Sequence, residues 1–508
     1  MSPLFVIVLI VAYFAILIGV SLLTGKEETN KTFFTGNRDA KWYIIAFGMI
    51  GTSISGITFI SVPGAVGTGN FSYMQVVLGY LLGYMIVAYV LLPLYYRLNL
   101  TSIYQYLEQR FGSVTYKTGA IFFLVSRLIG SALRLGVVSI VLNQLVFAPL
   151  HIPFWVSVLT TVGLIYLYTF QSGVKTVIWT DTVQTVGLLA GLIITIVIIM
   201  QKMEWGVAET YSRIAESNYS QWFVWDWKSP GFFLKAFLGG AAITVSMTGL
   251  DQDMMQKNLA CKNIGDAQKN MRWFSVTLVV VNLLFLGMGV LLYLYATEAG
   301  LIQWETLNGK AQLLFKNSAG GWDKIRTDAL FPRLANENLG KAAAITFILG
   351  VIAAAYSSAD SAMTALTSSF CIDILGFEKK TVTDREMRST RHKVHIMFGL
   401  LLFGVILFFY WLNDQSLIDK VLGVAGYTYG PLLGLYAFGI LTQYKVKDKL
   451  VPVVCLAAPL ISYFLQNGIP FSGGTYFLTG SFKFGIEILI VNGLLTFAGL
   501  WLIRRKGE

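Results

Sequence analysis

The chain has 508 residues, of which 55% are hydrophobic and only 13% are charged, and its mean hydropathy is +0.65. This composition excludes a soluble domain of this size and indicates a polytopic membrane protein. The net charge of +11 is compatible with nucleic-acid binding, but about two dozen of the 38 Lys and Arg residues fall in alternate loops between hydrophobic runs. We therefore attribute the charge to membrane topology, with the basic loops in the cytoplasm, and expect no nucleic-acid partner.

At about 20 apolar residues per span, the sequence predicts an all-α fold with roughly thirteen transmembrane helices. The first run, "PLFVIVLIVAYFAILIGVSLL", lacks a basic leading segment and a small-residue cleavage site, so we expect a retained helix. An odd number of helices then places the N-terminus outside and the C-terminus in the cytoplasm. The helices are predicted to begin near Pro3, Trp42, Tyr73, Lys117, Pro153, Thr176, Phe232, Trp273, Gly340, Lys393, Leu417, Leu450 and Phe477.

Two long loops, 204–230 and 299–339, fall on the outside, where they either cap an entrance or are simply solvated. The cytoplasmic loops are short, so we expect no nucleotide-driven engine, and an ion gradient must supply the energy. Three Cys and three His residues occur at no metal-ligand spacing, and no nucleophile, base and orienting group occur together. We therefore expect no enzyme, no cofactor, and no metal other than a coupling ion.

The second hydrophobic segment, "WYIIAFGMIGTSISGITFISVPG", is a poor continuous helix. It contains Gly48, Gly51, Gly56 and Pro63 among four hydroxyl side chains. A helix that breaks at membrane depth is tolerated beside protein or a cavity, where its freed carbonyls can coordinate a cation. The alternative is a glycine-rich face for helix packing.

The stretch "AAAYSSADSAMTALTSS" carries hydroxyls on one helical face, because Ala354, Ser357, Ser358 and Ser361 follow the spacing i, i+3, i+4, i+7. Two hydroxyls and one carbonyl supply only part of a sodium shell, so the missing oxygens must come from the broken second segment. The alternative is a seam of small residues whose hydroxyls bond to carbonyls of their own helix. The predicted main sodium site comprises Gly51, Ile54, Ala354, Ser357 and Ser358.

Asp360, in the same stretch, needs a partner, since an ionised carboxylate in a bilayer helix costs at least about 2.5 to 3.5 kcal/mol. Asp181, in "KTVIWTDTVQT", is a second carboxylate near the start of another helix. If the two helices touch, Asp181, Ser357, Asp360 and Ser361 form a second sodium site. Otherwise Asp181 is an acid at a helix N-terminus, solvated at the membrane interface.

Two arginines lie seven residues apart in "LVSRLIGSALRLGVV", and therefore on nearly one helical face. A buried guanidinium suits a substrate carboxylate held by two hydrogen bonds. We assign this role to Arg134, and for Arg127 we favour an internal salt bridge or a side chain that snorkels to the interface. Further along, Asp251, Asp253 and their neighbours are predicted to line the cytoplasmic mouth, and the glycine-rich "LGVAGYTYGPLLGLYAFGIL" is predicted to be a hinge.

Several of these segments together resemble the sodium:solute symporter family over nearly the whole chain. The resemblance rests on "SISGITFISVPG", "TSIYQYLEQRFG", "GVKTVIWTDTVQ", "DQDMMQKNLACKNIGDAQK", "AAAYSSADSAMTALTSSFCIDIL" and "YGPLLGL", in the order of the family. It implies the leucine-transporter fold, with two inverted repeats of five helices. The implied organisation is a leading helix and loop at 1–41, repeats at 42–202 and 231–441 with an external loop at 203–230 between them, and trailing helices at 442–508.

Carried over residue by residue, the main sodium site of the family falls on the five residues proposed above. Within the family the chain is most similar to bacterial sialic acid symporters, which implies substrate contacts at Ser53, Ser55, Thr58, Tyr73, Gln75 and Arg134. Asp360 stands where these symporters have a serine of the second sodium site, and Val77 stands where they have a glutamine.

We therefore expect a sodium-coupled symporter that imports a small polar solute by alternating access. A carboxylated sugar such as sialic acid, or another organic anion, is favoured by Arg134, and the alternative is a neutral sugar or polyol. A solute sensor or a sodium leak channel on the same fold is the alternative of a different class. The expected setting is the lipid bilayer of a bacterial inner membrane, with a monomer as the functional unit.

Overall fold

The computed structural model describes residues 3–24, 29–170, 173–307, 310–317, 320–377, 383–412, 417–471, 474–476 and 484–505. Within these residues, eight helical segments are long and apolar enough to cross a membrane. They are α1 (Pro3–Thr24), α5 (Tyr73–Ile86) continued by η2 (Val87–Leu91) and α6 (Leu92–Arg97), α8 (Ser113–Leu142), α10 (Val174–Lys202), α14 (Ile264–Glu298), α16 (Lys341–Ser369) continued by η8 (Phe370–Ile374), α17 (Asp384–Trp411), and η10 (Asp448–Leu450) with α19 (Val451–Asn467).

Two further spans are broken. Helix α3 (Trp42–Ser53) meets α4 (Gly56–Gly69) at 59°, and α12 (Phe233–Thr244) with η6 (Val245–Gly249) meets α13 (Gln252–Leu259) at 64°. At each break a polar side chain caps the second helix, since Ser55 accepts from the amide of Thr58 and Asp251 accepts from the amides of Asp253 and Met254. Because the helix is interrupted at each break, the carbonyls that end the first helix lack the amide groups that would bond to them in a continuous helix.

Three more apolar helices complete the bundle: α9 (Phe154–Thr169), α18 (Leu417–Leu441) and α20 (Ile488–Leu502). The described part of the chain thus contains ten candidate spans, if each bent pair is counted as one, and these three further helices. The broken spans open two successive sets of five, α3 to α10 and α12 to α18. Because five is odd, the second set enters the bundle from the opposite face, which is the arrangement of inverted repeats.

The predicted starts of several helices were wrong. Helices α14 and α17 begin about nine residues early because polar caps extend them beyond the apolar run: Asn263 accepts from the amide of Asp266 at 2.9 Å, and Thr383 forms a capping box with Glu386. The last helix begins at Ile488 instead of Phe477, which lies outside the described residues.

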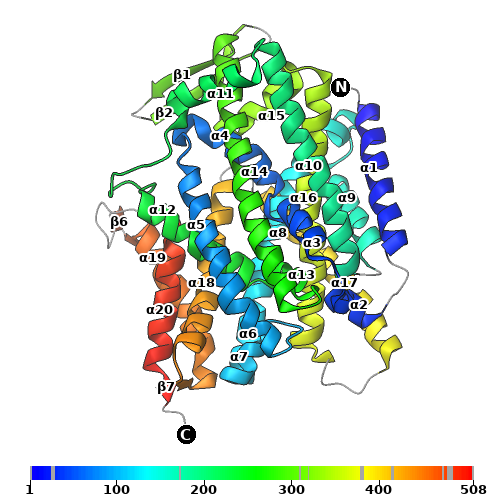
Figure 1. Cartoon of the computed structure of the whole chain (residues 1–508), viewed down its shortest axis with the longest axis vertical. Helices are drawn as coiled ribbons and strands as arrows, with labels where there is room; N and C mark the ends of the chain where they lie inside the picture. The colour runs from blue at the N-terminus through cyan, green and yellow to red at the C-terminus, as the bar shows by residue number, and fades with distance from the viewer. Residues whose placement is uncertain are drawn as a thin grey trace.

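The two termini lie at opposite ends of the molecule (Figure 1). At the N-terminal end, which we call the N-terminal face, the long loops fold into α11 (Val207–Glu216), the antiparallel sheet β1 (Ile302–Leu307), β2 (Lys310–Lys316) and β3 (Trp322–Ile325), and α15 (Leu330–Glu337). Helix α15 is seated on the bundle, since the ring of Phe331 lies 5.7 Å from that of Phe59 and 4.8 Å from that of Phe347. The loops are therefore folded caps and not simply solvated segments.

Helix α16 forms the centre of the bundle. Every residue from Gly350 to Ser369 is buried, and the helix packs against α3, α4, α8, α10 and α13. The polar side chains of this segment therefore find their partners inside the protein or in an internal cavity, because no water or lipid headgroup reaches them.

Candidate functional site

A cavity of about 150 Å³ lies beside both helix breaks. Five of the six predicted substrate contacts line it: Ser53, Ser55, Thr58, Tyr73 and Arg134. The remaining lining residues are Thr52, Ile54, Tyr80, Tyr84, Arg127, Ile243, Thr244, Met247, Thr248, Met254, Leu278 and Asn282. Hydroxyl groups and two guanidinium groups thus face a space that apolar and aromatic side chains otherwise enclose.

Arg134 and Arg127 differ in their partners although both project from α8. Arg134 is half-buried and, among the described residues, forms no hydrogen bond or ion pair with the protein. Arg127 is buried and pairs with two carboxylates: its Nη1 lies 3.7 Å from Asp251 Oδ2, and its Nη2 bonds to Asp253 Oδ2. The internal salt bridge expected for Arg127 is present, and the guanidinium of Arg134 is left facing the cavity.

The same contacts correct the prediction that Asp251 and Asp253 line a solvated mouth. Both carboxylates are fully buried. The hydroxyl of Tyr429 donates to Asp251 Oδ2, and that of Ser361 donates to Asp253 Oδ1. Helix α13 is therefore tied by polar contacts to α8, α16 and α18.

The end of α3 faces α16 across the predicted main sodium site. The Ser358 hydroxyl donates to the carbonyl of Thr52 at 3.2 Å, and Ser357 Oγ lies 3.4 Å from Thr52 Oγ1. A Cβ on Gly51 would lie 3.4 Å from Ser357 Oγ and only 2.5 Å from Thr185 Oγ1, so glycine is needed for this approach. Ile54 stands at the break itself, with φ −88° and ψ 89°.

The carbonyls of the last turn of α3 thus meet the hydroxyl face of α16, and Ala354 lies buried one turn before Ser357 and Ser358 on that face. Carbonyl and hydroxyl oxygens are the ligands that hard cations prefer. The structure brings all five predicted residues to one junction between α3 and α16.

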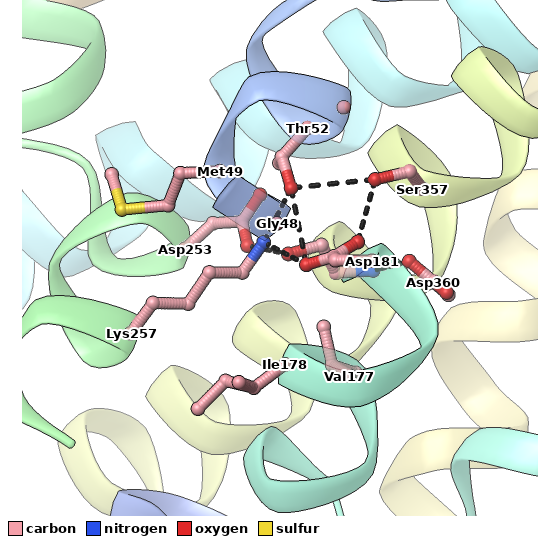
Figure 2. A network of polar contacts seen from close by, with 12 residues as sticks. Gly48, Met49, Thr52, Val177, Ile178, Asp181, Asp253, Lys257, Ser357 and Asp360 are labelled. Atoms are coloured by element: carbon pink, nitrogen blue, oxygen red, sulfur yellow. Dashed lines mark hydrogen bonds and ion pairs between the residues drawn. The ribbon is translucent and has the colours of Figure 1, made fainter. Parts of the chain in front are cut away.

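Asp181 belongs to a different arrangement from the one predicted (Figure 2). Its Oδ2 accepts from Lys257 Nζ at 2.6 Å and from Thr52 Oγ1 at 3.1 Å, and its Oδ1 accepts from Ser357 Oγ at 2.5 Å. Lys257 Nζ also donates to Thr52 Oγ1 at 2.7 Å. Asp181 is fully buried, so it is not the interfacial, solvated acid that was the alternative interpretation.

Asp360 and Ser361 turn away from this centre. Asp360 Oδ2 accepts from the Tyr168 hydroxyl at 2.9 Å and from Gln184 Nε2 at 3.4 Å, while Ser361 bonds to Asp253. The side chains of the four residues predicted for a second sodium site therefore have different partners: Asp181 and Ser357 bond to each other, Asp360 bonds to Tyr168, and Ser361 bonds to Asp253. We call Arg127, Asp181, Asp251, Asp253 and Lys257 the paired network.

Comparison with known proteins agrees with this architecture. The model of the sodium:solute symporter family matches residues 33–446. The chain belongs to this family. The sodium/sialic acid symporter NanT of Aliivibrio fischeri is 25% identical over 434 residues, which cover 84% of this chain and 80% of NanT. The sodium-coupled monocarboxylate transporter 1 of Mus musculus is 24% identical over 425 residues, covering 83% and 66% of the two chains.

The fold of the symporter is that of a solved Na⁺-coupled sialic acid symporter in a substrate-bound, outward-open state, with a TM-score of 0.78 at 19% identity over 98% of both chains. It is the leucine-transporter fold with inverted repeats. The family members and structural neighbours are transporters and not enzymes.

Gln75 of the symporter has a structural environment and not the predicted substrate contact. Its Nε2 donates to the carbonyls of Ser72 and Gly231, each at 3.1 Å, and its Oε1 accepts from the amide of Val224 at 3.1 Å. The side chain is fully buried and does not line the cavity. It anchors the loop that precedes α12 to the start of α5.

Lys257 is the residue that reasoning from sequence missed. It lies in the motif "DQDMMQKNLACKN", whose acidic residues were predicted to line the cytoplasmic mouth, and no partner was assigned to it. The available signal was the need of a buried carboxylate for a cation. That need had been assigned to sodium, although a lysine in a neighbouring span meets it equally well.

Proposed function

We propose that this symporter couples the entry of sodium to the import of a small organic anion by alternating access. The observation that carries the proposal is the guanidinium of Arg134, which faces the cavity without a protein partner among the described residues. A charged group in a low-dielectric site is stabilised chiefly by an opposite charge, and a carboxylate matches a guanidinium through two parallel hydrogen bonds. A bound carboxylate would neutralise the guanidinium of Arg134, as Asp251 and Asp253 neutralise that of Arg127.

The relatives support a carboxylate. The name of one describes transport of sialic acid and that of the other describes transport of monocarboxylates, and both substrates carry a carboxyl group. The hydroxyls of Ser53, Ser55, Thr58 and Tyr73 are suited to the remaining polar groups of the solute. They also support the second candidate, a neutral sugar or polyol.

The size of the cavity favours a compact solute in this conformation. Its volume of about 150 Å³ is below the range of roughly 300 to 1,000 Å³ typical of pockets for drug-sized ligands. A small monocarboxylate fits such a volume, whereas sialic acid requires the cavity to widen as the surrounding helices move.

We assign the coupling sodium to the junction of α3 and α16, with the carbonyls of Gly51, Ile54 and Ala354 and the hydroxyls of Ser357 and Ser358 as ligands. The contact between Ser358 and the Thr52 carbonyl supports this assignment, because it holds the two oxygen-rich segments together. Each sodium that crosses a potential of about 100 mV contributes about 2.3 kcal/mol, apart from its concentration gradient.

We further propose that the N-terminal face is extracellular and that the protein works as a monomer in a plasma membrane, most simply a bacterial inner membrane. The basic loops support this orientation, since their described residues 29–41, 383–393 and 503–505 lie toward the end of the bundle opposite the N-terminal face.

Uptake into proteoliposomes tests the proposal. Purified symporter is reconstituted, an inward sodium gradient is imposed, and uptake of radiolabelled lactate, sialic acid and a neutral hexose is compared with uptake in a matched potassium gradient. We expect sodium-driven accumulation of one carboxylate and none of the hexose. Accumulation of the hexose alone would favour the second candidate, and a sodium current that needs no solute would indicate a channel.

A further inference from the structure

The side-chain nitrogen of Lys257 lies where the second sodium ion was predicted. The ammonium of Lys257 is within hydrogen-bond distance of Asp181 Oδ2 and Thr52 Oγ1, at 2.6 and 2.7 Å (Figure 2). The lysine side chain is 1% exposed, and that of Asp181 is equally buried. A lysine is almost never buried to this extent unless it is paired with a carboxylate.

The oxygens that a second sodium would need are already engaged. Both carboxylate oxygens of Asp181 accept hydrogen bonds, from Lys257, Thr52 and Ser357. Ser361, another predicted ligand, donates its hydroxyl to Asp253. Asp360 accepts from Tyr168 and from the amide of Ser361, so its oxygens are directed at other partners.

We propose that Lys257 takes the place of a second coupling ion, so that this symporter binds a single sodium. Its ammonium neutralises Asp181 from within the chain, as a sodium ion would from solution. A sodium ion at Asp181 would also stand close to the ammonium, and like charges at such separations repel strongly in a low-dielectric interior. The inference rests on the proposed sodium coupling through the first site.

Lys257 lies on a broken span, so its contacts connect several helices. Helix α13 carries Lys257 and Asp253, and it contacts α3, α10 and α16, on which Thr52, Asp181 and Ser361 lie. The tethered cation therefore joins α3, α10 and α13 in this conformation. A free ion could leave the site into the cytoplasm, whereas the lysine remains attached to the chain in every state of the cycle.

The first test counts bound sodium ions. Full-length symporter in nanodiscs is titrated with radioactive sodium alone, and the number of ions bound per protein at saturation is measured. We expect one ion for the unmodified protein. Two ions would overturn the inference and leave the proposed coupling intact, whereas no bound sodium would instead defeat the proposed coupling on which the inference rests.

The second test removes the cation that pairs with the carboxylate of Asp181. Lys257→Gln removes the ammonium, and we expect the number of bound ions to rise from one to two. Adding Asp181→Asn should return it to one, because the freed carboxylate is then neutral, and adding Ser358→Ala to Lys257→Gln should weaken binding at the first of the two sites and leave binding at the new site unchanged. A folded Lys257→Gln protein that still binds one ion would overturn the inference.

Two further variants serve as controls. Lys262→Gln removes an exposed lysine from the same segment and should leave the count at one. Lys257→Arg keeps the positive charge and should also leave it at one, whereas two ions bound by this variant would overturn the inference. If Lys257→Gln does not fold, the unmodified protein and Lys257→Arg still decide the question.

Discussion

The cavity and the paired network use the same kinds of side chain in opposite ways. In the paired network every charged group has an opposite charge inside the protein, and the contacts join α8, α10 and α13. In the cavity Arg134 has none within the part of the chain that the structure describes, although it lies on the same helix as Arg127 and seven residues away. The difference indicates that charge alone does not mark a ligand site, and the proposed substrate site is based on the absence of an internal partner for Arg134 among the described residues.

The largest expected effect comes from breaking the paired network. Arg127→Met leaves Asp251 and Asp253 buried without their cation, and removal of one member of a buried ion pair costs about 3 to 5 kcal/mol. We expect thermal unfolding in detergent at a clearly lower temperature. The matched control is Lys117→Met, which removes an exposed charge from the same helix. Equal stability of the Arg127 and Lys117 variants would contradict the structural role of the network.

Arg134→Met is the complementary change. Because Arg134 has no partner among the residues that the structure describes, we expect the unfolding temperature to stay unchanged or to shift upward. Affinity for the carboxylate should fall by about 2 kcal/mol or more, which is about 30-fold or more. Solute affinity is measured by titration of the purified protein, and sodium binding, measured in parallel, should persist. Loss of stability with unchanged solute affinity would place Arg134 in the same class as Arg127.

The outcome for these residues shows how far sequence carries the argument. The break at Ile54 was predictable, because glycines, hydroxyls and a proline in one apolar segment weaken a helix locally. The role of Arg127 was narrowed to two interpretations by the cost of burying a charge. Its choice of Asp251 and Asp253 depends on contacts between residues more than 120 positions apart, which no local pattern encodes.

Gln75 and Lys257 show what local pattern misses. A glutamine near the predicted cavity looks like a substrate contact, yet tertiary structure directs its amide at three backbone groups. Lysine at the end of a broken span looks solvated, yet the 64° bend turns it into the bundle. Both errors arise because side-chain direction at a helix break depends on the angle between the two halves.

Ser358→Ala tests whether the junction of α3 and α16 binds an ion, as a ligand site does, or only holds helices together, as the paired network does. Loss of one oxygen that contacts a cation costs about 1.5 to 3 kcal/mol, so the sodium concentration for half-maximal uptake should rise at least about tenfold. Ser368→Ala is the matched control, since Ser368 is buried on the same helix and its hydroxyl has no partner among the described residues. Unchanged sodium dependence after Ser358→Ala would count against the proposed site.

Gly51→Ala perturbs the same junction sterically. The new methyl group would lie 2.5 Å from Thr185 Oγ1, and overpacking of this kind costs about 1 to 3 kcal/mol. We expect lower thermal stability and weaker sodium dependence together, because α3 must move away from α10. Combining the change with Thr185→Ala should restore part of both, and failure of this rescue would show that the contact with Thr185 is not the cause.

A solvent-exposed ion pair on the N-terminal face can be compared with the buried pairs of the paired network. Breaking it should change stability least. The carboxylate of Asp323 on β3 accepts from Asn317 at 3.0 Å and from Arg333 at 3.2 Å, and these hydrogen bonds lower the pKa of Asp323 below its usual value. Since the folded pKa lies below the unfolded one, the stabilisation is present above the unfolded pKa of about 3.9 and is lost as pH falls through the folded pKa. Exposed ion pairs are screened by water and contribute little to stability, so we expect the loss of protection to be small and limited to the sheet.

Hydrogen exchange of the β2 and β3 amides measures this effect. We expect protection to fall as the pH drops below the unfolded pKa of about 3.9 in the unmodified protein, and Asp323→Asn to remove that step while leaving the bundle amides unchanged. Glu305→Gln, on β1 at the opposite edge of the same sheet, is the control and should keep the step. A step of equal size in Asp323→Asn would assign the acid sensitivity to another group. If the pH step is absent from the unmodified protein while Arg127→Met is strongly destabilised, then buried ion pairs stabilise this symporter and the exposed pair does not.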